Sequence, residues 1–480
     1  MTSLEWLDQA DRTSPWPLAR VLVAGLGRSG MAAAQVLLDL GAHVTVVDDA
    51  NGGPQQASAR QLESLGAAVR LASVDSPDDY DLLIPSPGIN PRSPLVVAAQ
   101  RSRIPVWSGE RLAWHLRPTG STWLTVSGTN GKTTTVEMLN AILTAAGVHC
   151  AAVGNIGRPL VEAVTAEPPY DVLAVELSSF QLHFTRGLQP EAAALLNVGV
   201  DHIDWHETFD AYVDDKARVF DGARRAVVYN VADPTTERLA RNAEVEPGCA
   251  GVGFTLGAPA AGMLGVVDGV LVDRAFVTDP AVEAAELATL DDLNLPGSHN
   301  VENALAASAL ARAHGVPADA VRSGLRGFQP APHRTQLVDT IDGVAYVDDS
   351  KATNADAALV SLRTFRPVVW IAGGLAKGGR FDDLVGLTSS RLRGVVLIGR
   401  DRGLLRDALR RHAPQVHVIE VVAGETDLMD DVVSAAAGLA VPGDTVLLAP
   451  ACASMDQFTD YAARGDAFAA AVRRRSDGGS

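Results

Sequence analysis

Residues 123–135 read WLTVSGTNGKTTT, and in this stretch a buried strand turns into a helix. Residues 123–126 are mostly apolar, as a short strand inside a sheet requires, and Gly147 marks the end of the helix that follows. Between them, the residues from Gly128 to Thr133 form a glycine-rich turn. The backbone N–H groups of such a turn, together with a helix N-terminus, hold phosphate. The stretch therefore predicts a phosphate-binding loop.

The polar residues of this loop fit the chemistry of a nucleotide phosphate. Lys132 is placed to reach the outer phosphates, and Thr133 offers a hydroxyl to Mg²⁺. The spacing is a tight G-x-x-G-K-T, because Val126 or Ser127 stands near the place where a glycine is usual. The simplest alternative is an ordinary strand–turn–helix with an exposed lysine. The strand before the loop and the helix after it favour the phosphate loop.

Composition limits the classes of protein that this chain can belong to. Its 480 residues are enough for two to four domains, at about 100–200 residues each. A net charge of −17 argues against a nucleic-acid-binding protein, which needs a basic stripe. The three cysteines show no pairing or metal-binding spacing, and there is neither a signal-peptide pattern nor a long apolar run. We expect a cytoplasmic protein that binds neither membrane nor nucleic acid.

A second glycine-rich turn lies near the start of the chain. Residues 20–30, RVLVAGLGRSG, place Gly25, Gly27 and Gly30 between a strand and a helix, and the next strand ends at Asp48 or Asp49. Read alone, this pattern predicts a dinucleotide site and suggests an NAD-dependent dehydrogenase. The alternative is a tight turn without a ligand. The next strand of this unit ends in residues that could contact the same ligand: Ser86, Pro87 and Gly88.

Polar side chains follow two further strands of the central region. The apolar run 171–175 ends at Glu176, and the run 192–198 is followed by Asp201 and His202. Ligands of open α/β sheets gather at the carboxyl ends of the strands, so we expect these side chains to meet Lys132 and Thr133. Mg²⁺ suits such carboxylate, hydroxyl and phosphate oxygens. The pattern leaves open whether His202 binds an ion or only lies beside the site.

Lys216 is unusual because it lies on the apolar side of a predicted helix, 209–220. It stands one turn from both Tyr212 and Phe220. A lysine is rarely buried without a partner. The pattern alone therefore favours a side chain that extends along the apolar face and keeps its ammonium in water.

The second half of the chain predicts peripheral strands and loops over 245–290, and then a helix that begins near residue 298. Asn300 and Asn303 lie at its start, where they either cap the helix or contact a ligand. The proline-rich stretch 328–334 is the predicted boundary of a third α/β unit. In that unit, polar residues again follow the strands. The predicted fold is α/β with three domains: 1–110, 111–330 and 331–480.

Eight blocks in this order resemble the Mur ligases of peptidoglycan synthesis, and in particular their D-glutamate-adding branch. The blocks are GTNGKTTT (128–135), GNIG (154–157), ELSSFQL (176–182), NVGVDHIDWH (197–206), LPGSHNVENALAA (295–307), HRTQ (333–336), DDSKATN (348–354) and PACASMDQF (450–458). The resemblance covers about residues 18–472. Met455 stands where leucine is common, a nearly neutral difference because the two side chains have similar volumes.

The resemblance implies an activity and its partners. A Mur ligase of this branch uses ATP to join D-glutamate to UDP-N-acetylmuramoyl-L-alanine through an acyl phosphate. The first, Rossmann-like domain would hold the UDP group rather than NAD, the central domain would be a P-loop-type ATPase, and the Rossmann-like C-terminal domain would bind the amino acid. Two Mg²⁺ ions and a CO₂-derived carbamate on Lys216 are also implied. We expect a monomer.

The resemblance assigns roles residue by residue. The central catalytic group would be Lys132, Glu176, His202 and Lys216. Mg²⁺ would be bound by Thr133, Glu176, His202 and the carbamate of Lys216. ATP would contact Gly128, Thr129, Asn130, Gly131, Lys132, Thr133, Thr134, Asn300, Asn303, Arg334 and Asp349. The UDP substrate would contact Gly27, Arg28, Ser29, Gly30, Asp48, Ser86, Pro87, Gly88, Asn155 and Ser178. D-Glutamate would contact Lys351, Thr353, Lys377, Ser454 and Phe458.

Three other functions compete with this one. A dehydrogenase would use the N-terminal glycine turn for NAD, but it leaves the phosphate loop and Glu176 unexplained. Folate-adding ligases share the ATP domain and the carbamate, yet do not need the N-terminal glycine turn. A nucleotide-binding switch would hold or hydrolyse ATP without needing an amino acid. The ligase explains more of the sequence than any of them.

Overall fold

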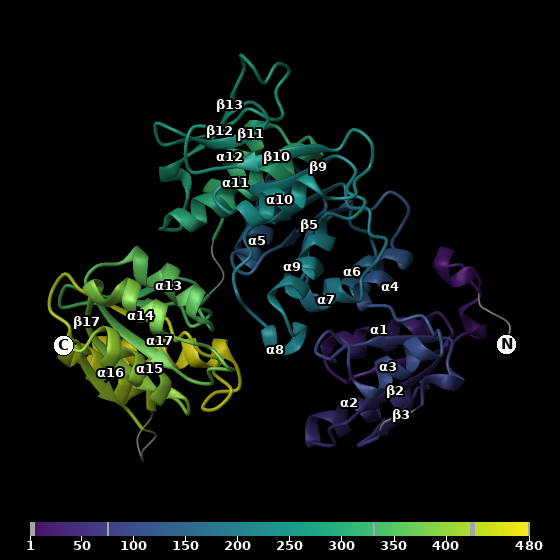
Figure 1. Cartoon of the computed structure of the whole chain (residues 1–480), viewed down its shortest axis with the longest axis horizontal. Helices are drawn as coiled ribbons and strands as arrows, with labels where there is room; N and C mark the ends of the chain where they lie inside the picture. The colour runs from purple at the N-terminus through teal and green to yellow at the C-terminus, as the bar shows by residue number, and fades with distance from the viewer. Residues whose placement is uncertain (1–4, 74–75, 330–331, 423–427, 479–480) are drawn as a thin grey trace. The chain divides into compact units, whose positions relative to one another are not determined.

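The computed structural model describes residues 5–73, 76–329, 332–422 and 428–478 (Figure 1). It divides into two compact units, and each is described here by itself. The first comprises Met1–Leu293 and Val301–Phe328, and the second comprises Asn294–Asn300 and Gln329–Ser480. The predicted boundary between residues 330 and 331 lies outside the described residues.

The first unit begins with a parallel sheet of order β3-β2-β1-β4. Alternate residues of β1 face opposite layers: Val21 and Val23 pack with α1 and α2, whereas Leu22 and Ala24 pack with α3. The elements are β1 Arg20–Ala24, α1 Arg28–Asp39, β2 His43–Asp48, α2 Gly53–Ser64, β3 Ala68–Leu71, β4 Leu82–Pro85, α3 Pro94–Arg101 and α4 Gly109–Leu116, with short 3-10 turns at Glu5–Gln9, Trp16–Leu18 and Pro77–Asp79.

A nine-stranded sheet forms the rest of the first unit, in the order β13-β12-β11-β10-β9-β8-β5-β7-β6. Its pairs are parallel from β11 to β6, and β12 and β13 add an antiparallel edge. The strands are β5 Thr122–Ser127, β6 Cys150–Gly154, β7 Val172–Glu176, β8 Ala192–Leu195, β9 Ala226–Asn230, β10 Ala250–Phe254, β11 Met263–Val267, β12 Val270–Asp273 and β13 Ala285–Thr289.

The helices of this part follow the strands, as a parallel sheet requires. Strand β8 ends three residues earlier than the sequence predicts, because Asn197 leaves the ladder to bond the phosphate loop. The helices are α5 Lys132–Ala145, α6 Leu160–Val164, α7 Ser179–His183, α8 Ile203–His206, α9 Phe209–Ala217, α10 Pro234–Arg241, α11 Ser298–His314 and α12 Ala318–Gly327, with 3-10 turns at Arg218–Phe220 and Leu290–Asp292.

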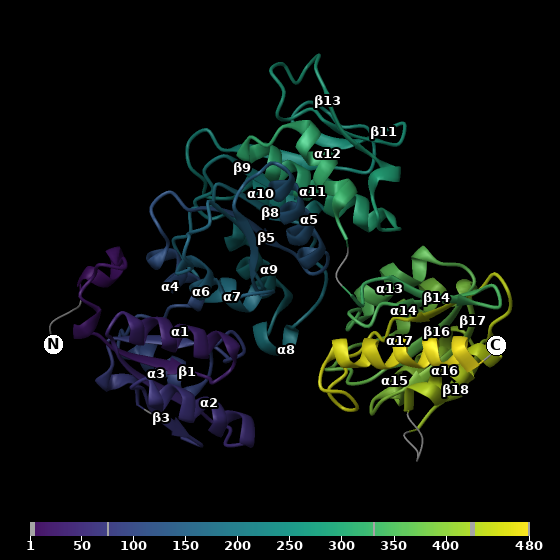
Figure 2. The same ribbon diagram turned by 180° about the vertical axis from the view of Figure 1, so that it is seen from behind.

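The second unit is a six-stranded sheet of order β14-β15-β19-β16-β17-β18 with helices on both faces. Helices α13, α14 and α15 cover one face, and α16 and α17 cover the other (Figure 2). The elements are β14 Gln336–Ile341, β15 Val344–Asp348, α13 Ala355–Thr364, β16 Val368–Gly373, α14 Asp382–Thr388, β17 Leu392–Ile398, α15 Arg402–His412, β18 His417–Glu420, α16 Leu428–Leu439, β19 Thr445–Leu448 and α17 Tyr461–Gly478, with a 3-10 turn at Ser389–Arg391.

The predicted fold class is confirmed: three α/β sheets, mostly parallel, lie within the described residues. The antiparallel pairs are confined to sheet edges, at β11–β12–β13 and β14–β15. None of the helices within the described ranges combines the length and apolarity needed to span a bilayer.

Candidate active site

The phosphate loop connects β5 to α5. Gly131 is the N-cap residue of α5 with φ of 85°, and a Cβ there would lie 2.3 Å from Oδ1 of Asn303. The loop is held in place by Asn197, whose Oδ1 accepts from the backbone N–H of Asn130 at 2.8 Å. Lys132 Nζ donates to the Gly128 and Thr129 carbonyls at 2.8 and 2.9 Å. These bonds hold the loop in place at the N-terminus of α5, where phosphate binding by a loop of this kind is expected.

Strands β5 and β7 are neighbours, and their ends bring the predicted oxygen ligands together. The Thr133 hydroxyl donates to Oε2 of Glu176 at 2.7 Å. The Asn155 amide donates to Oε1 of the same carboxylate, also at 2.7 Å. Glu176 is 1% exposed, so the fold holds a buried carboxylate beside the loop hydroxyl. The expected meeting of Glu176 with the phosphate loop is confirmed.

His202 follows β8 and is the N-cap residue of α8, in the left-handed region with φ of 53°. Its ring lies 4.5 Å from that of Phe180. Burial lowers the pKa of His202, Asp201 opposes this, and the charges of Lys132 and Lys216 lower it further. The imidazole therefore lies within the electrostatic reach of both lysines.

Lys216 is buried, at 2% exposure. Its Nζ donates to the Gly128 carbonyl at 2.6 Å and lies 4.8 Å from the centre of the Tyr212 ring. Burial, and then the charge of Lys132, lower the pKa of Lys216 well below its usual value. The expectation of an ammonium that extends to water is therefore wrong. The reason is that the phosphate loop, 88 positions away in sequence, covers the end of the side chain.

The two asparagines at the start of α11 have different surroundings. Asn303 lies beside the phosphate loop, where its Oδ1 accepts from the Thr135 hydroxyl at 3.3 Å. Asn300 is buried, and its amide donates to the Pro296 carbonyl at 2.7 Å. The division between the two units falls between these residues. Asn303 is thus placed with the loop by direct contact, whereas Asn300 belongs to the second unit.

The N-terminal glycine turn gathers three strand ends. The Leu26 amide donates to Oδ2 of Asp48 at 2.6 Å, and the Ser86 hydroxyl donates to the Gly25 carbonyl at 3.3 Å. Asp48 thus holds the turn itself. A Cβ on Gly30 would lie 1.9 Å from the Gly25 carbonyl oxygen, so this glycine is needed for the helix to pack on the strand. The Arg28 guanidinium, exposed on the turn, donates to the Gly157 carbonyl.

Ser178 begins α7 in a capping box. Its hydroxyl accepts from the Gln181 amide N–H, while Oε1 of Gln181 accepts from the Ser178 backbone. The side-chain amide of Gln181 donates in turn to the buried Glu110 at 2.5 Å. This chain of contacts fixes the turn that follows Glu176.

The second unit places its candidate residues after neighbouring parallel strands. Lys351 and Thr353 follow β15, Ser454 follows β19, and Lys377 follows β16; β19 lies between the other two strands. Buried Asp349 accepts from the Thr335 amide at 3.1 Å and from the Ser361 hydroxyl. Burial raises the pKa of Asp349 to about 6, although these bonds and the charge of Arg334 oppose the rise.

Some contacts at these sites involve residues that the sequence analysis did not select. The Tyr461 ring lies 3.9 Å from Lys351 Nζ, whereas Phe458 packs against the core formed with α16 and α17. Buried Arg464 donates to the hydroxyl and carbonyl of Ser350 and to the Cys452 carbonyl. The aromatic position three residues after Phe458 was the available signal for Tyr461.

In the first unit the unselected residues centre on Asp215. It is 5% exposed at its side chain and bonds His183, His206 and Arg218. Burial would raise the pKa of Asp215, but these partners lower it to about 2. The signal that was available is its position three residues after Tyr212, on the buried side of the helix.

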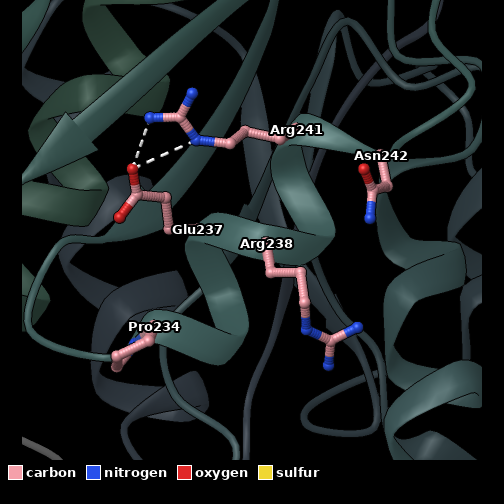
Figure 3. Close-up of a pocket in the computed structure, with 5 residues that line it drawn as sticks. All are labelled: Pro234, Glu237, Arg238, Arg241 and Asn242. Atoms are coloured by element: carbon pink, nitrogen blue, oxygen red, sulfur yellow. Dashed lines mark hydrogen bonds and ion pairs between the residues drawn. The ribbon is translucent and has the colours of Figure 1, made fainter.

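A small open pocket of about 220 Å³ lies on the surface at α10 (Figure 3). It is lined by Pro234, Glu237, Arg238, Arg241 and Asn242. Glu237 and Arg241 pair with each other across one helical turn, at 2.6 Å. No candidate site residue lines this pocket, so it does not belong to the sites described above.

Family comparisons cover most of the chain. Residues 19–108 match the Mur ligase MurD-like N-terminal domain, residues 126–311 the Mur ligase middle domain, and residues 333–452 the Mur ligase glutamate ligase domain. The UDP-N-acetylmuramoylalanine–D-glutamate ligase of Streptomyces avermitilis is 56% identical over 460 residues, covering 95% of this chain and 98% of that protein. The protein of the same name from Thermobifida fusca is 53% identical, covering 95% and 98%.

Solved structures share the fold at low sequence identity. MurF ligase from Thermotoga maritima, crystallised with ADP, gives a TM-score of 0.56 at 17% identity, over 90% of this chain and 96% of that chain. UDP-N-acetylmuramate-alanine ligase from the same organism gives 0.55 at 19% identity, over 96% and 100%. The fold agreement and the much higher identity to the curated relatives point the same way: the chain belongs to the Mur ligase family.

Proposed function

We propose that this chain is an ATP-dependent ligase that adds D-glutamate to UDP-N-acetylmuramoyl-L-alanine in cytoplasmic peptidoglycan precursor synthesis, acting as a monomer. The proposal rests on one observation above all. Lys132, Glu176 and Lys216 meet at one sheet edge, in a chain 56% identical to a relative that bears that enzyme's name. Phosphoryl transfer is catalysed by positioning and by cations around the phosphates, and the phosphate loop with Lys132 and the buried Glu176 carboxylate supply groups of these kinds.

The reaction proceeds in two steps. The carboxylate of the L-alanine group attacks the γ-phosphorus of ATP, and the bond to the β-phosphate oxygen breaks, which gives an acyl phosphate and ADP. The amine of D-glutamate then attacks the acyl carbon. The tetrahedral intermediate loses phosphate and the amine loses a proton, which leaves an amide. Most of the catalysis is positioning and charge stabilisation.

The chain's own residues supply these two effects. Lys132 stands at the N-terminus of α5, where its ammonium and the loop amides neutralise the phosphates. Asn155 and Thr133 orient the two oxygens of Glu176 by hydrogen bonds. Asn303 borders the same loop. Because Glu176 is buried, its orientation is fixed before any ligand arrives.

The residues present fit Mg²⁺ that arrives with a nucleotide. Mg²⁺ takes one or two carboxylates plus phosphate oxygens, and the Thr133 hydroxyl and Glu176 carboxylate, 2.7 Å apart, are hard oxygen donors. No cluster of three or more His, Cys, Asp or Glu side chains suited to a metal lies within the described residues, so the phosphates would complete the shell. Bound Mg²⁺ neutralises phosphate charge. His202 and Lys216 would hold a second ion.

Lys216 would do so as a carbamate. A neutral amine attacks CO₂ and releases one proton, so a carbamate forms most readily on a lysine with a low pKa. The burial of Lys216 and its neighbour Lys132 lower that pKa. The product is an anion whose oxygens are ligands for Mg²⁺. A buried cation would thereby become a buried anion beside a metal.

The proposal also includes three domains, at 1–110, 111–330 and 331–480. It further includes the contacts with the UDP substrate, with D-glutamate and with ATP. The UDP substrate would lie on the N-terminal glycine turn, supported by the meeting of Asp48 and Ser86 there. D-Glutamate would lie on the loops after β15, β16 and β19. Arg334, Asp349 and Asn300 would contact ATP. Arg334 lies near enough to Asp349 for its charge to oppose the rise in the pKa of that carboxyl.

Phosphate release tests the assignment. ATP and Mg²⁺ are supplied with UDP-N-acetylmuramoyl-L-alanine, with or without D-glutamate, and L-glutamate is the control. We expect release that requires both the muramoyl substrate and D-glutamate. Release with another amino acid would change the member of the family, and release that needs neither substrate would favour a nucleotide switch.

The carbamate has its own test, because it is too labile for routine mass spectrometry. Lys216→Ala should lose turnover, and acetate or formate should restore part of it by placing a carboxylate in the vacated space. Failure of every short acid to restore activity would count against the carbamate.

A further inference from the structure

Asp215 lies immediately before Lys216, but its carboxylate serves a different side of α9. Oδ2 accepts from Nδ1 of His183 at 2.8 Å and from Nδ1 of His206 at 2.9 Å. Oδ1 lies 2.6 Å from the guanidinium of Arg218. One buried carboxylate thus binds side chains from α7, α8 and the turn after α9.

The contacts continue from His206 to α7. Nε2 of His206 lies 3.0 Å from the Ser179 hydroxyl, which completes a Ser–His–Asp hydrogen-bonded chain like that of serine hydrolases. Ser179 and His206 are 3% and 5% exposed, and the Asp215 side chain is equally buried. A substrate cannot reach Ser179, so this serine does not act as a nucleophile. The hydrogen bonds from Ser179 to Asp215 instead hold the helices together.

The three helices need such a clamp because they are short. Helices α7, α8 and α9 contain five, four and nine residues. Isolated helices below about 12 residues are marginal in water, so tertiary contacts must set their positions. Arg218 adds to this, since it also donates to the His183 carbonyl at 2.7 Å and thereby caps α7.

Each of these helices carries a candidate site residue. Ser178 is the N-cap residue of α7, His202 is the N-cap residue of α8, and Lys216 lies in the last turn of α9. A shift of one helix would therefore change the distance between two of these side chains. We propose that Asp215 is a positioning residue, which fixes α7, α8 and α9 so that His202 and Lys216 are held at the spacing needed to bind one Mg²⁺ ion. This inference rests on the proposed function.

Asp214 provides a matched control. It is the preceding residue of the same helix, has the same chemistry, and is exposed. Asp215→Asn keeps the shape of the side chain but removes its charge. It also replaces one carboxylate oxygen with an N–H₂ group, which cannot accept the hydrogen bonds that the partners of Asp215 donate. Asp214→Asn makes the same chemical change at the surface.

The test measures Mn²⁺ as a probe for Mg²⁺, by the electron paramagnetic resonance signal of free Mn²⁺. The full chain is saturated with a non-hydrolysable ATP analogue and UDP-N-acetylmuramoyl-L-alanine in bicarbonate buffer. Wild type should bind two Mn²⁺ ions. In Asp215→Asn, one of the two should bind at least about tenfold more weakly, because losing a group that positions metal ligands typically lowers metal affinity about 10- to 100-fold. Asp214→Asn should match wild type.

The outcomes separate positioning from simple structural support. A lower unfolding temperature with both Mn²⁺ affinities unchanged would overturn the inference, and so would equal weakening in the two variants. If Asp215→Asn does not fold, His183→Ala replaces it, because that side chain is 28% exposed and its loss removes one of the three partners. His183→Ala should weaken the binding of the same one of the two Mn²⁺ ions. Amide formation is assayed separately: its absence in a wild type that binds both ions would refute the proposed function alone.

Discussion

Replacing Lys216 with methionine should make the protein more stable and inactive at the same time. Methionine has a similar length, no charge, and the flexibility to fill the same space. The prediction tests whether the buried Lys216 lowers the stability of the fold while being needed for activity. If it does, removing the amine relieves the fold and removes the function.

The magnitude follows from the contacts of the side chain. Burying an ammonium costs on the order of 5 kcal/mol. Within the described residues, Lys216 Nζ bonds a backbone carbonyl rather than a carboxylate. The bond to the Gly128 carbonyl returns about 2 kcal/mol, and the Tyr212 ring returns about 2 kcal/mol. Gly128 keeps a donor without Lys216, because Lys132 Nζ lies 2.8 Å from its carbonyl. We therefore expect Lys216→Met to gain about 1 kcal/mol, and turnover to fall by about 10³-fold or more.

The assay is urea unfolding in CO₂-free buffer without metal, with Lys377→Met as the control because that lysine is exposed. Bicarbonate with Mg²⁺ should then stabilise the wild type but not Lys216→Met, since only the wild type can form the ligand. A loss of about 1 kcal/mol or more in Lys216→Met would refute the reasoning, because it would make the lysine a net stabilising group.

Three other predictions concern the other candidate sites. Lys132→Ala should lower turnover by about 10³-fold or more, and a retained wild-type rate would exclude its role at the phosphates. Gly27→Ala meets open space and should change stability by less than about 1 kcal/mol, while raising KM for the UDP substrate about tenfold; Gly30→Ala, whose Cβ would lie 1.9 Å from a carbonyl oxygen, should fail to fold correctly. Asp349 has a pKa of about 6 in the folded chain against 3.8, so the wild type loses stability as pH rises through about 6. Urea titrations should therefore show Asp349→Asn more stable than wild type by about 1 to 3 kcal/mol at pH 8. At pH 4 the two proteins should be nearly equal in stability. The same difference at both pH values would contradict the raised pKa of Asp349.

Much of the fold could be predicted from short patterns, because each pattern is local. Apolar runs that end in a glycine turn and continue into a helix predict parallel strands with crossover helices. The same logic places Thr133 and Glu176 together, since parallel neighbours end at one edge. The length of β8 was overestimated, because the apolar run continues to Val198 while the backbone already turns toward the phosphate loop at Asn197.

The contacts within the site could not be predicted in the same way. Asp214 and Asp215 are chemically identical neighbours, and only their helical phase separates a surface carboxylate from a buried one. The two histidine partners of Asp215 lie 9 and 32 positions away, in short helices whose placement the sequence pattern does not give. Lys216 was misjudged for a related reason. Its burial depends on a loop carbonyl from another strand end, which no helical pattern contains.

The use of lysine across the chain supports one interpretation of these sites. The chain has four lysines among its 40 Lys and Arg residues, and all four, Lys132, Lys216, Lys351 and Lys377, are candidate site residues. Arginine supplies the other cations of the chain, among them the buried Arg464, which donates to Ser350 and to the Cys452 carbonyl. An arginine cannot lose its proton in a protein and its planar head is wide, whereas a lysine amine is compact and changes its pKa readily. At Lys216 the difference is decisive, because only a neutral amine can take up CO₂, and burial lowers the pKa of that amine.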